Sequence, residues 1–299
     1  MNQPHPRLPE FKYYQPKSSK EAVDFLAKHA NQSRPFAGGT DCFNQIRDKR
    51  IHPKYLVDLK SIEGFRKIKF DPKKGLTIGA AVPLNKIISH PKVLEYYPVL
   101  IEAAREVGGY QLRNRATLVG NLCNASPCGD TIGPCLAYRS KVHIVGPDGR
   151  HEVDLKDFFE GPGKTCLRSG EIVESISFPI PQLGTRGTYQ SIGRNKLGDL
   201  AIAAVTVLGY KKIDSPSGYE FLLTLTAVAP VVIFVDSAQD ILKTQPIKHS
   251  ILEQAALACA EACKPIDDIR SSSHYRRDMI QMLALRGLEK TCELLNLPL

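Results

Sequence analysis

The segment SRPFAGGTDCFNQIR, residues 33–47, places two adjacent glycines between a strand-like pattern and a helical one. Residues 33–37 predict a short strand, and residues 43–47 predict a short helix. Glycine has no side chain, so the backbone of Ala37-Gly38-Gly39-Thr40-Asp41 can approach a ligand closely. Free N–H groups at such a turn bind anions. The segment therefore predicts an anion-binding turn, with a phosphate group as its ligand.

The flanking elements indicate how this turn is held. Ser18 precedes a helical pattern over residues 20–29, and a serine hydroxyl at that position can cap the first helical turn. Residues 55–59 predict a second strand, so the order is strand, helix, strand. That order is typical of parallel strand pairing. We expect residues 1–60 to form the first structural unit.

A second glycine-containing stretch, residues 108–131, is too polar for a buried element and too long for a simple turn. Long ordered loops tend to be functional, so we interpret it as a loop with a binding role. Gly120 and Gly129 permit close approach, and three side chains are suitable hydrogen-bond donors: Thr117, Asn121 and Asn124. Asp130 could accept hydrogen bonds from ribose hydroxyls. Two such loops together suit a ligand that carries two phosphates.

The remaining chain divides into two further units. Residues 61–180 contain patterns for a strand, a helix and a hairpin, at residues 75–81, 92–107 and 142–154. In residues 181–299, three strand patterns precede two helical ones: residues 188–191, 201–208 and 220–229, then 251–263 and 273–295. Strands followed by helices are typical of a separate α+β domain. The fold class expected for the whole chain is α+β.

Composition limits the classes of function. The chain has 299 residues and a formal charge of +9, which favours acidic partners. Its basic residues are scattered without the interleaved aromatic series of a nucleic-acid-binding surface, so we expect no nucleic-acid partner. Its longest apolar run, residues 223–235, is shorter than the ~20 residues of a membrane span. Residues 1–7 lack the apolar core of a secretory signal, and we expect a cytoplasmic location.

The sequence gives little support for a nucleotide-triphosphate site, a metal site or a catalytic nucleophile. Residues 161–165, Gly-Pro-Gly-Lys-Thr, suggest a nucleotide-triphosphate loop, but Phe158 occupies the place of its first glycine, so we interpret the segment as a structural turn. The cysteine spacing matches no iron–sulfur ligand pattern and no histidines pair at ligand spacing, so we expect no metal here. A redox role stays open for three thiols: Cys123, Cys128 and Cys135. We name no catalytic residue, because no nucleophile–base arrangement is visible, and expect a cofactor to supply the chemistry.

The two loops, AGGTD (37–41) and RNRATLVGNLCNASPCGDT (113–131), closely resemble those of the FAD-binding subunit of molybdenum hydroxylases. That family includes xanthine dehydrogenase and the medium subunit of aerobic carbon monoxide dehydrogenase. Further matching segments follow in the family's order: residues 159–165, 170–176, 189–194 and 275–277. The resemblance covers the chain from about Phe11 to Leu295. The family usually has Thr-Ile-Gly-Gly-Asn in the second loop, where this chain has Val119 in place of the first glycine.

The resemblance implies a fold and a set of cofactor contacts. Two α/β subdomains clasp FAD (the PCMH-type FAD-binding fold), and an α+β carboxy-terminal domain follows. The diphosphate lies on the first loop and the strand before it: Arg34, Pro35, Phe36, Ala37, Gly38, Gly39 and Thr40. The second loop contributes further contacts: Thr117, Gly120, Asn121 and Asn124. Asp130 matches a carboxylate on the ribose or adenosine side, Val173 an aliphatic position against the adenine, and Gln190 a polar position near the flavin.

The resemblance also implies a function and partners. The chain would be the FAD-carrying electron-transfer subunit of a multi-subunit molybdenum hydroxylase, an oxidoreductase. A small subunit with two [2Fe-2S] clusters would supply electrons, and a large subunit would hold the molybdenum–pterin cofactor, within a dimer of heterotrimers. The substrate and the external electron acceptor stay open. Two alternatives also stay open: a self-sufficient flavin-dependent oxidase or dehydrogenase, and a basic nucleic-acid or assembly module.

Overall fold

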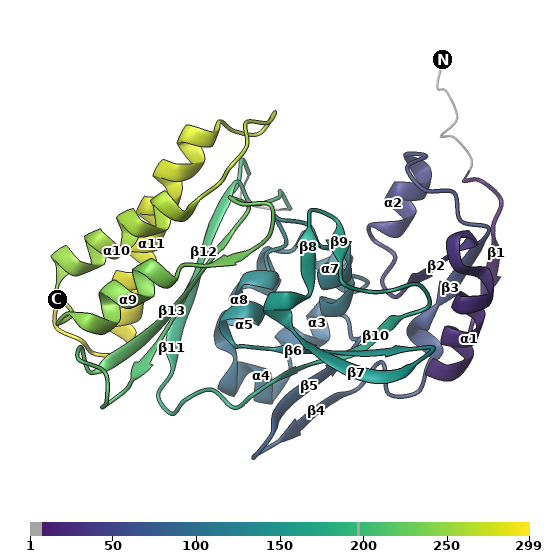
Figure 1. Cartoon of the computed structure of the whole chain (residues 1–299), viewed down its shortest axis with the longest axis horizontal. Helices are drawn as coiled ribbons and strands as arrows, with labels where there is room; N and C mark the ends of the chain where they lie inside the picture. The colour runs from purple at the N-terminus through teal and green to yellow at the C-terminus, as the bar shows by residue number, and fades with distance from the viewer. Residues whose placement is uncertain (1–7, 196–197) are drawn as a thin grey trace.

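The computed structural model describes residues 8–195 and 198–299 and arranges them as three units in a row (Figure 1). The amino-terminal unit lies at one end, the carboxy-terminal unit at the other, and the middle unit between them. The mixture of helices and sheets confirms the expected α+β fold class. No helix within the described residues is long and apolar enough to span a membrane. The expectation drawn from residues 1–7 falls outside the described part of the chain.

The first unit is a small parallel sheet with helices beside it. Its elements follow in the order β1 (Lys12–Tyr14), α1 (Ser19–His29), η1 (Ala30–Gln32), β2 (Ser33–Phe36), α2 (Cys42–Arg47), β3 (Tyr55–Asp58) and η2 (Leu59–Ser61), where η marks a 3-10 turn. Both β1 and β2 pair with β3 in parallel, which confirms the pairing predicted from the strand–helix–strand order. The Ser18 hydroxyl caps α1 as expected, since it accepts a hydrogen bond from the N–H of Glu21 at 3.1 Å.

The middle unit is built on a five-stranded antiparallel sheet. The strand order is β4-β5-β10-β6-β7. The bounds are β4 (Ile68–Asp71), β5 (Gly75–Gly79), β6 (Lys141–Gly146), β7 (Gly149–Asp154) and β10 (Ile172–Phe178). A separate hairpin follows the turn η3 (Leu155–Asp157) and pairs β8 (Phe159–Gly161) with β9 (Lys164–Thr165). Between β5 and β6 the chain forms α3 (Leu84–Ile88), α4 (Pro91–Tyr96), α5 (Pro98–Glu106), α6 (Tyr110–Arg113), α7 (Leu118–Asn124) and α8 (Ile132–Ala137).

Two sequence-based expectations for the middle unit were wrong. The helix expected over residues 92–107 is broken into α4 and α5, because Pro98 has no N–H to continue the first helix and instead starts the second. The loop expected over residues 108–131 contains α6 and α7. α7 forms because three apolar side chains interspersed among its polar residues are buried together: Leu118, Val119 and Leu122.

The third unit is a four-stranded antiparallel sheet with helices on its outer face (Figure 1). Its strands are β11 (Arg186–Ile192), β12 (Ala203–Lys211), β13 (Tyr219–Thr226) and β14 (Ile233–Phe234). Its helices are α9 (Asp236–Thr244), α10 (His249–Ala262) and α11 (Ser273–Leu294). α11 packs on β11 and β12, and α9 packs on β13. The strands-then-helices order predicted from the sequence is therefore the order that the structure shows.

The inner face of this sheet contacts the middle unit through α5 and α8. At the centre, Gly133 of α8 lies against threonine hydroxyls. A Cβ at this residue would come within 2.8 Å of Thr206 Oγ1 and 2.9 Å of Thr226 Oγ1. Thr224 Oγ1 also donates a hydrogen bond to the Gly133 carbonyl at 3.1 Å. The absence of a side chain at Gly133 thus lets α8 sit directly on the sheet.

We predict that Gly133→Ala destabilises the protein by about 1–3 kcal/mol, because the added methyl group overpacks a site closed by short, buried side chains. Thermal unfolding followed by calorimetry measures the change. Gly109→Ala is a matched control, since a Cβ there would make only an ordinary contact, 3.5 Å from Gln111 Oε1. Unfolding of Gly133→Ala at the wild-type temperature would contradict the close contact.

Candidate functional site

The two glycine-containing loops lie against each other, and they touch at Gly38. A Cβ on Gly38 would stand 2.2 Å from the carbonyl oxygen of Arg115 and 3.1 Å from the Cα of Ala116. No side chain fits in that space, so the backbone of the first loop packs directly on the backbone that leads into the second. The structure thus brings together the two segments that the sequence predicted to share one ligand.

The first loop presents unused backbone donors. Gly39 has φ +79°, a left-handed conformation that favours glycine, and its carbonyl accepts the N–H of Phe43 at 3.0 Å. The chain therefore turns sharply between β2 and α2. Within the described part of the chain, the N–H groups of Gly38, Gly39 and Thr40 have no hydrogen-bond acceptor. Free donors in a tight turn are suited to phosphate oxygens.

The second loop begins α7, and Thr117 is the cap of that helix. The Thr117 hydroxyl accepts a hydrogen bond from the N–H of Gly120 at 2.9 Å, so this side chain holds the helix start in place. Beyond Thr117, the N–H of Leu118 faces the Val82 carbonyl across an isolated antiparallel bridge between Pro83 and Thr117, whereas the N–H of Val119 lacks an acceptor among residues 8–195 and 198–299. The Val119 side chain is buried in the core, so it does not occupy the space in front of the loop.

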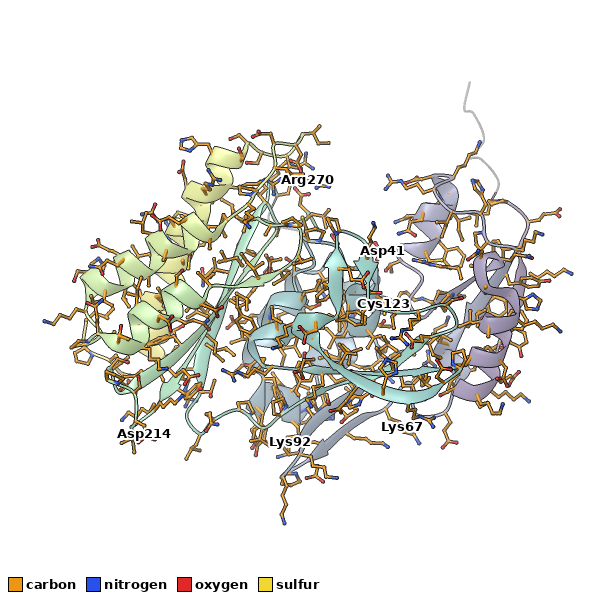
Figure 2. The ribbon with its side chains drawn as sticks, in the orientation of Figure 1. Asp41, Lys67, Lys92, Cys123, Asp214 and Arg270 are labelled. Atoms are coloured by element: carbon orange, nitrogen blue, oxygen red, sulfur yellow. The ribbon has the colours of Figure 1, made fainter. Side chains whose placement is uncertain are left out.

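The two asparagines of α7 have different neighbours. Asn124 Oδ1 accepts a hydrogen bond from Gln45 Nε2 of α2 at 3.4 Å, which links α7 to the first unit. Asn121 Oδ1 lies 2.5 Å from the place where a Cβ on Gly129 would stand, so Gly129 makes room for this amide. Figure 2 labels Asp41, the last residue of the first loop, and Cys123, on α7, where these two units face each other.

The strand that leads to the first loop divides its side chains between core and surface. Phe36 is buried and makes edge-on contacts with the rings of Tyr13 and Phe43. Pro35 is half-buried, and Arg34 is exposed. Arg34 is therefore free to reach a ligand, while Phe36 anchors the start of the loop.

The structure turns Asp130 inward. Its carboxylate is buried, and Asp130 Oδ1 accepts a hydrogen bond from the Tyr189 hydroxyl at 2.7 Å. Burial raises the pKa of Asp130 to about 6, although the hydrogen bond from Tyr189 acts in the opposite direction. The ribose contact expected from the sequence therefore competes with an internal hydrogen bond. Sequence reasoning missed Tyr189, and the available signal was the alternation of β11, which places Tyr189 and Gln190 on opposite faces.

Gln190 lies away from the two loops. Its Nε2 donates to Thr188 Oγ1 at 3.0 Å, and its Cγ is 3.6 Å from where a Cβ on Gly287 of α11 would stand. Its side chain therefore faces α11, and its assignment to a position near the flavin stays a prediction. Val173 is buried in β10, and α7 contacts that strand. Its assignment to the adenine stays a prediction.

Other parts of the structure add to the surroundings of the loops. The β8–β9 hairpin is tied to the end of α7, since the N–H of Gly163 donates to the Ala125 carbonyl at 2.9 Å. The sequence had indicated only a structural turn there. The surface hollows beside α1 and on the middle sheet, lined for example by Glu21 and by His143, include none of the loop residues. The site is therefore defined by its backbone donors and close contacts.

The cysteines form no metal centre in the described residues. The eight thiols are free, and no group of three or more His, Cys, Asp or Glu side chains among residues 8–195 and 198–299 could hold a metal ion. Burial raises the pKa of the Cys135 thiol, so this residue is held in its neutral form.

Most of the chain matches two known domain families. A family model described as "FAD binding domain in molybdopterin dehydrogenase" matches residues 9–181, and one described as "CO dehydrogenase flavoprotein C-terminal domain" matches residues 188–291. The chain is similar to the carbon monoxide dehydrogenase medium chain of Hydrogenophaga pseudoflava. The two are 30% identical over 282 residues, which cover 94% of this chain and 96% of that one.

Two further proteins extend the comparison. The putative xanthine dehydrogenase FAD-binding subunit of Escherichia coli (strain K12) is 27% identical over 278 residues, covering 93% of this chain and 94% of the relative. Among solved structures, a carbon monoxide dehydrogenase from Hydrogenophaga pseudoflava that lacks the Mo-pyranopterin moiety of its cofactor superposes with a TM-score of 0.91 at 28% identity. The superposition covers 96% of this chain and 99% of that one.

The buried Asp130 predicts a pH dependence of stability. Its pKa is raised from the usual 3.8 to about 6 in the folded protein, so the stabilisation present below about pH 4 is lost as the pH rises through 6. Asp130→Asn keeps an acceptor for Tyr189 but cannot ionise. Its stability relative to the wild type should therefore increase by up to about 3 kcal/mol between about pH 4 and pH 7. Thermal unfolding of both proteins across this range measures the difference, and a constant difference would contradict the prediction.

Proposed function

Because the chain belongs to the family of FAD-binding medium subunits of molybdenum hydroxylases, we propose that it carries FAD between its first two units and transfers electrons within such an enzyme. Residues 1–60 and 61–180 form the two halves that hold the cofactor. Residues 181–299 pack on the second half through α5 and α8.

The free backbone donors of the two adjacent loops support this proposal most directly. The diphosphate of FAD carries negative charge and several acceptor oxygens, and the N–H groups of Gly38, Gly39 and Thr40 meet no competing acceptor within the described residues. The contact between Gly38 and Arg115 brings the start of α7 next to them. Glycine at these positions removes the side chains that would keep a phosphate away from the backbone.

The chain's own residues bind and orient the cofactor, and FAD, when bound, supplies the redox chemistry. We assign the diphosphate to the backbone of residues 37–40, with Arg34 at the surface beside it. Thr117 fixes the start of α7, and Asn121 and Asn124 supply side-chain amides from that helix. Asp130 contributes indirectly, by holding the end of the second loop against Tyr189.

We also propose the partners that the family membership implies. A small subunit with two [2Fe-2S] clusters delivers electrons to this chain, a large subunit holds the molybdenum–pterin cofactor, and an external acceptor receives the electrons. The relatives named above are a "medium chain" and an "FAD-binding subunit", which supports a multi-subunit assembly. Assembly as a dimer of heterotrimers and a cytoplasmic location complete the proposal.

We predict that Gly39→Leu removes most of the bound flavin, because Gly39 has a positive φ and a Cβ there would stand 2.8 Å from the Phe43 ring. Visible absorbance of the purified protein measures the flavin occupancy. Gly64→Leu is the matched control: Gly64 also has a positive φ, of +86°, but a Cβ there would meet nothing within 4 Å. Full flavin occupancy in Gly39→Leu would contradict the assignment of the first loop to the diphosphate.

We predict that the chain purified from its native source is accompanied by two other polypeptides, one of which carries iron–sulfur clusters. Mass spectrometry of the purified complex identifies the chains, and iron and molybdenum analysis identifies the metals. Isolation of this chain alone, yellow and fully active as an oxidase or dehydrogenase, would instead favour a self-sufficient flavoenzyme. A colourless chain that retains nucleic acid would favour a basic binding module.

A further inference from the structure

Lys60, in the turn η2 that follows β3, reaches back to the start of the first loop. Its ammonium group donates to the Ala37 carbonyl at 3.1 Å and to Asp58 Oδ1 at 2.6 Å. It also lies 4.2 Å from the centre of the Phe36 ring. Only 20% of the Lys60 side chain is exposed. The ammonium is therefore held by a carboxylate, a carbonyl and an aromatic face at once.

Asp58 keeps Lys60 in this position. The Asp58 side chain is buried, and it also accepts hydrogen bonds from the Tyr13 hydroxyl and from the Lys60 backbone N–H, the latter at 2.9 Å. A carboxylate with partners on both oxygens is fixed in orientation. Because Asp58 and Lys60 carry opposite charges at ion-pair distance, the pair adds little net charge to its surroundings.

The hydrogen bond to Ala37 has a consequence for the donor at Gly38. In a trans peptide, the carbonyl oxygen and the N–H of the following residue point in opposite directions. Since Lys60 holds the Ala37 carbonyl on its own side, the N–H of Gly38 must point to the other side. That N–H is one of the donors without an acceptor in the described part of the chain. Lys60 therefore sets the direction of a free donor that it does not touch.

We propose that Lys60 is a positioning residue for the cofactor, which acts through the Ala37–Gly38 peptide and not by contact with the ligand. This inference rests on the proposed function, because it assumes that the first loop binds the FAD diphosphate. Loss of the ammonium group frees the Ala37 carbonyl, so the peptide can rotate and the Gly38 N–H no longer has a fixed direction. Affinity for a diphosphate then falls although no ligand contact has been removed.

The test compares four full-length proteins with the wild type, each freed of flavin and titrated with FAD by flavin fluorescence. Lys60→Met should bind about tenfold more weakly, because a hydrogen bond from a charged group is lost. Lys60→Arg keeps a cationic donor and should stay within about threefold of the wild type. Lys67→Met is the control, since Lys67 is exposed and pairs with Glu63 at 3.5 Å, away from the loop. Lys67→Met should bind FAD with the affinity of the wild type.

A double variant, Asp58→Asn with Lys60→Met, distinguishes a change in the direction of the Ala37–Gly38 peptide from the effect of an unpaired negative charge on Asp58. It leaves no unpaired buried carboxylate to repel the diphosphate or to unfold the apoprotein, and we expect it to bind FAD as weakly as Lys60→Met. Recovery of wild-type affinity in the double variant would overturn the positioning role in favour of a charge effect. Thermal unfolding of each apoprotein verifies that it is folded.

The ³¹P resonances of bound FAD supply a second readout. They should move toward those of free FAD in Lys60→Met and remain at the wild-type positions in Lys60→Arg. Wild-type affinity and unchanged resonances in Lys60→Met would overturn the inference about Lys60 alone. Failure of the wild type itself to bind FAD would overturn the proposed function, so the two failures are distinguishable.

Discussion

Between Gly38 and the Arg115 carbonyl there is no room for a methyl group, and this spacing sets how closely the first unit approaches the middle one. The contact is made by backbone alone. It brings the unused N–H groups of the first loop beside the start of α7, where the N–H of Val119 is also unused, although each loop lies in a different unit. A side chain at Gly38 would separate the loops, so the absence of atoms at one position determines the geometry of the whole site.

The surrounding side chains stabilise that geometry from several directions. Lys60 and Asp58 hold the start of the first loop, and the Thr117 hydroxyl holds the start of α7. At the far end of the second loop, Asp130 is bound to Tyr189 of the third unit. Burial of that carboxylate opposes its ionisation. Near neutral pH, where the carboxylate is ionised, the buried Asp130 therefore lowers the stability of the folded protein. All three units thus contribute contacts that hold the two loops in place.

Elements whose signal lies in neighbouring residues were predicted correctly from the sequence. Neighbouring residues signal three such features: the Ser18 cap, the strand–helix–strand order and the glycine turn after Phe36. Prediction failed over residues 92–107 and 108–131. In the first range a proline starts a second helix, and in the second the apolar residues of α7 are interrupted by polar ones, so their shared burial is visible only once the core is formed.

By itself the sequence determined the family, the parallel first sheet and the two loops that face the proposed cofactor, because these depend on residue type and spacing along the chain. Only the tertiary structure decided which groups are left free to bind. Asp130 is turned inward, Gln190 is placed against α11, and Lys60 is brought to the Ala37 carbonyl by contacts between segments distant in sequence. The direction of a side chain or a peptide depends on what covers it, and in these cases the covering group comes from elsewhere in the chain.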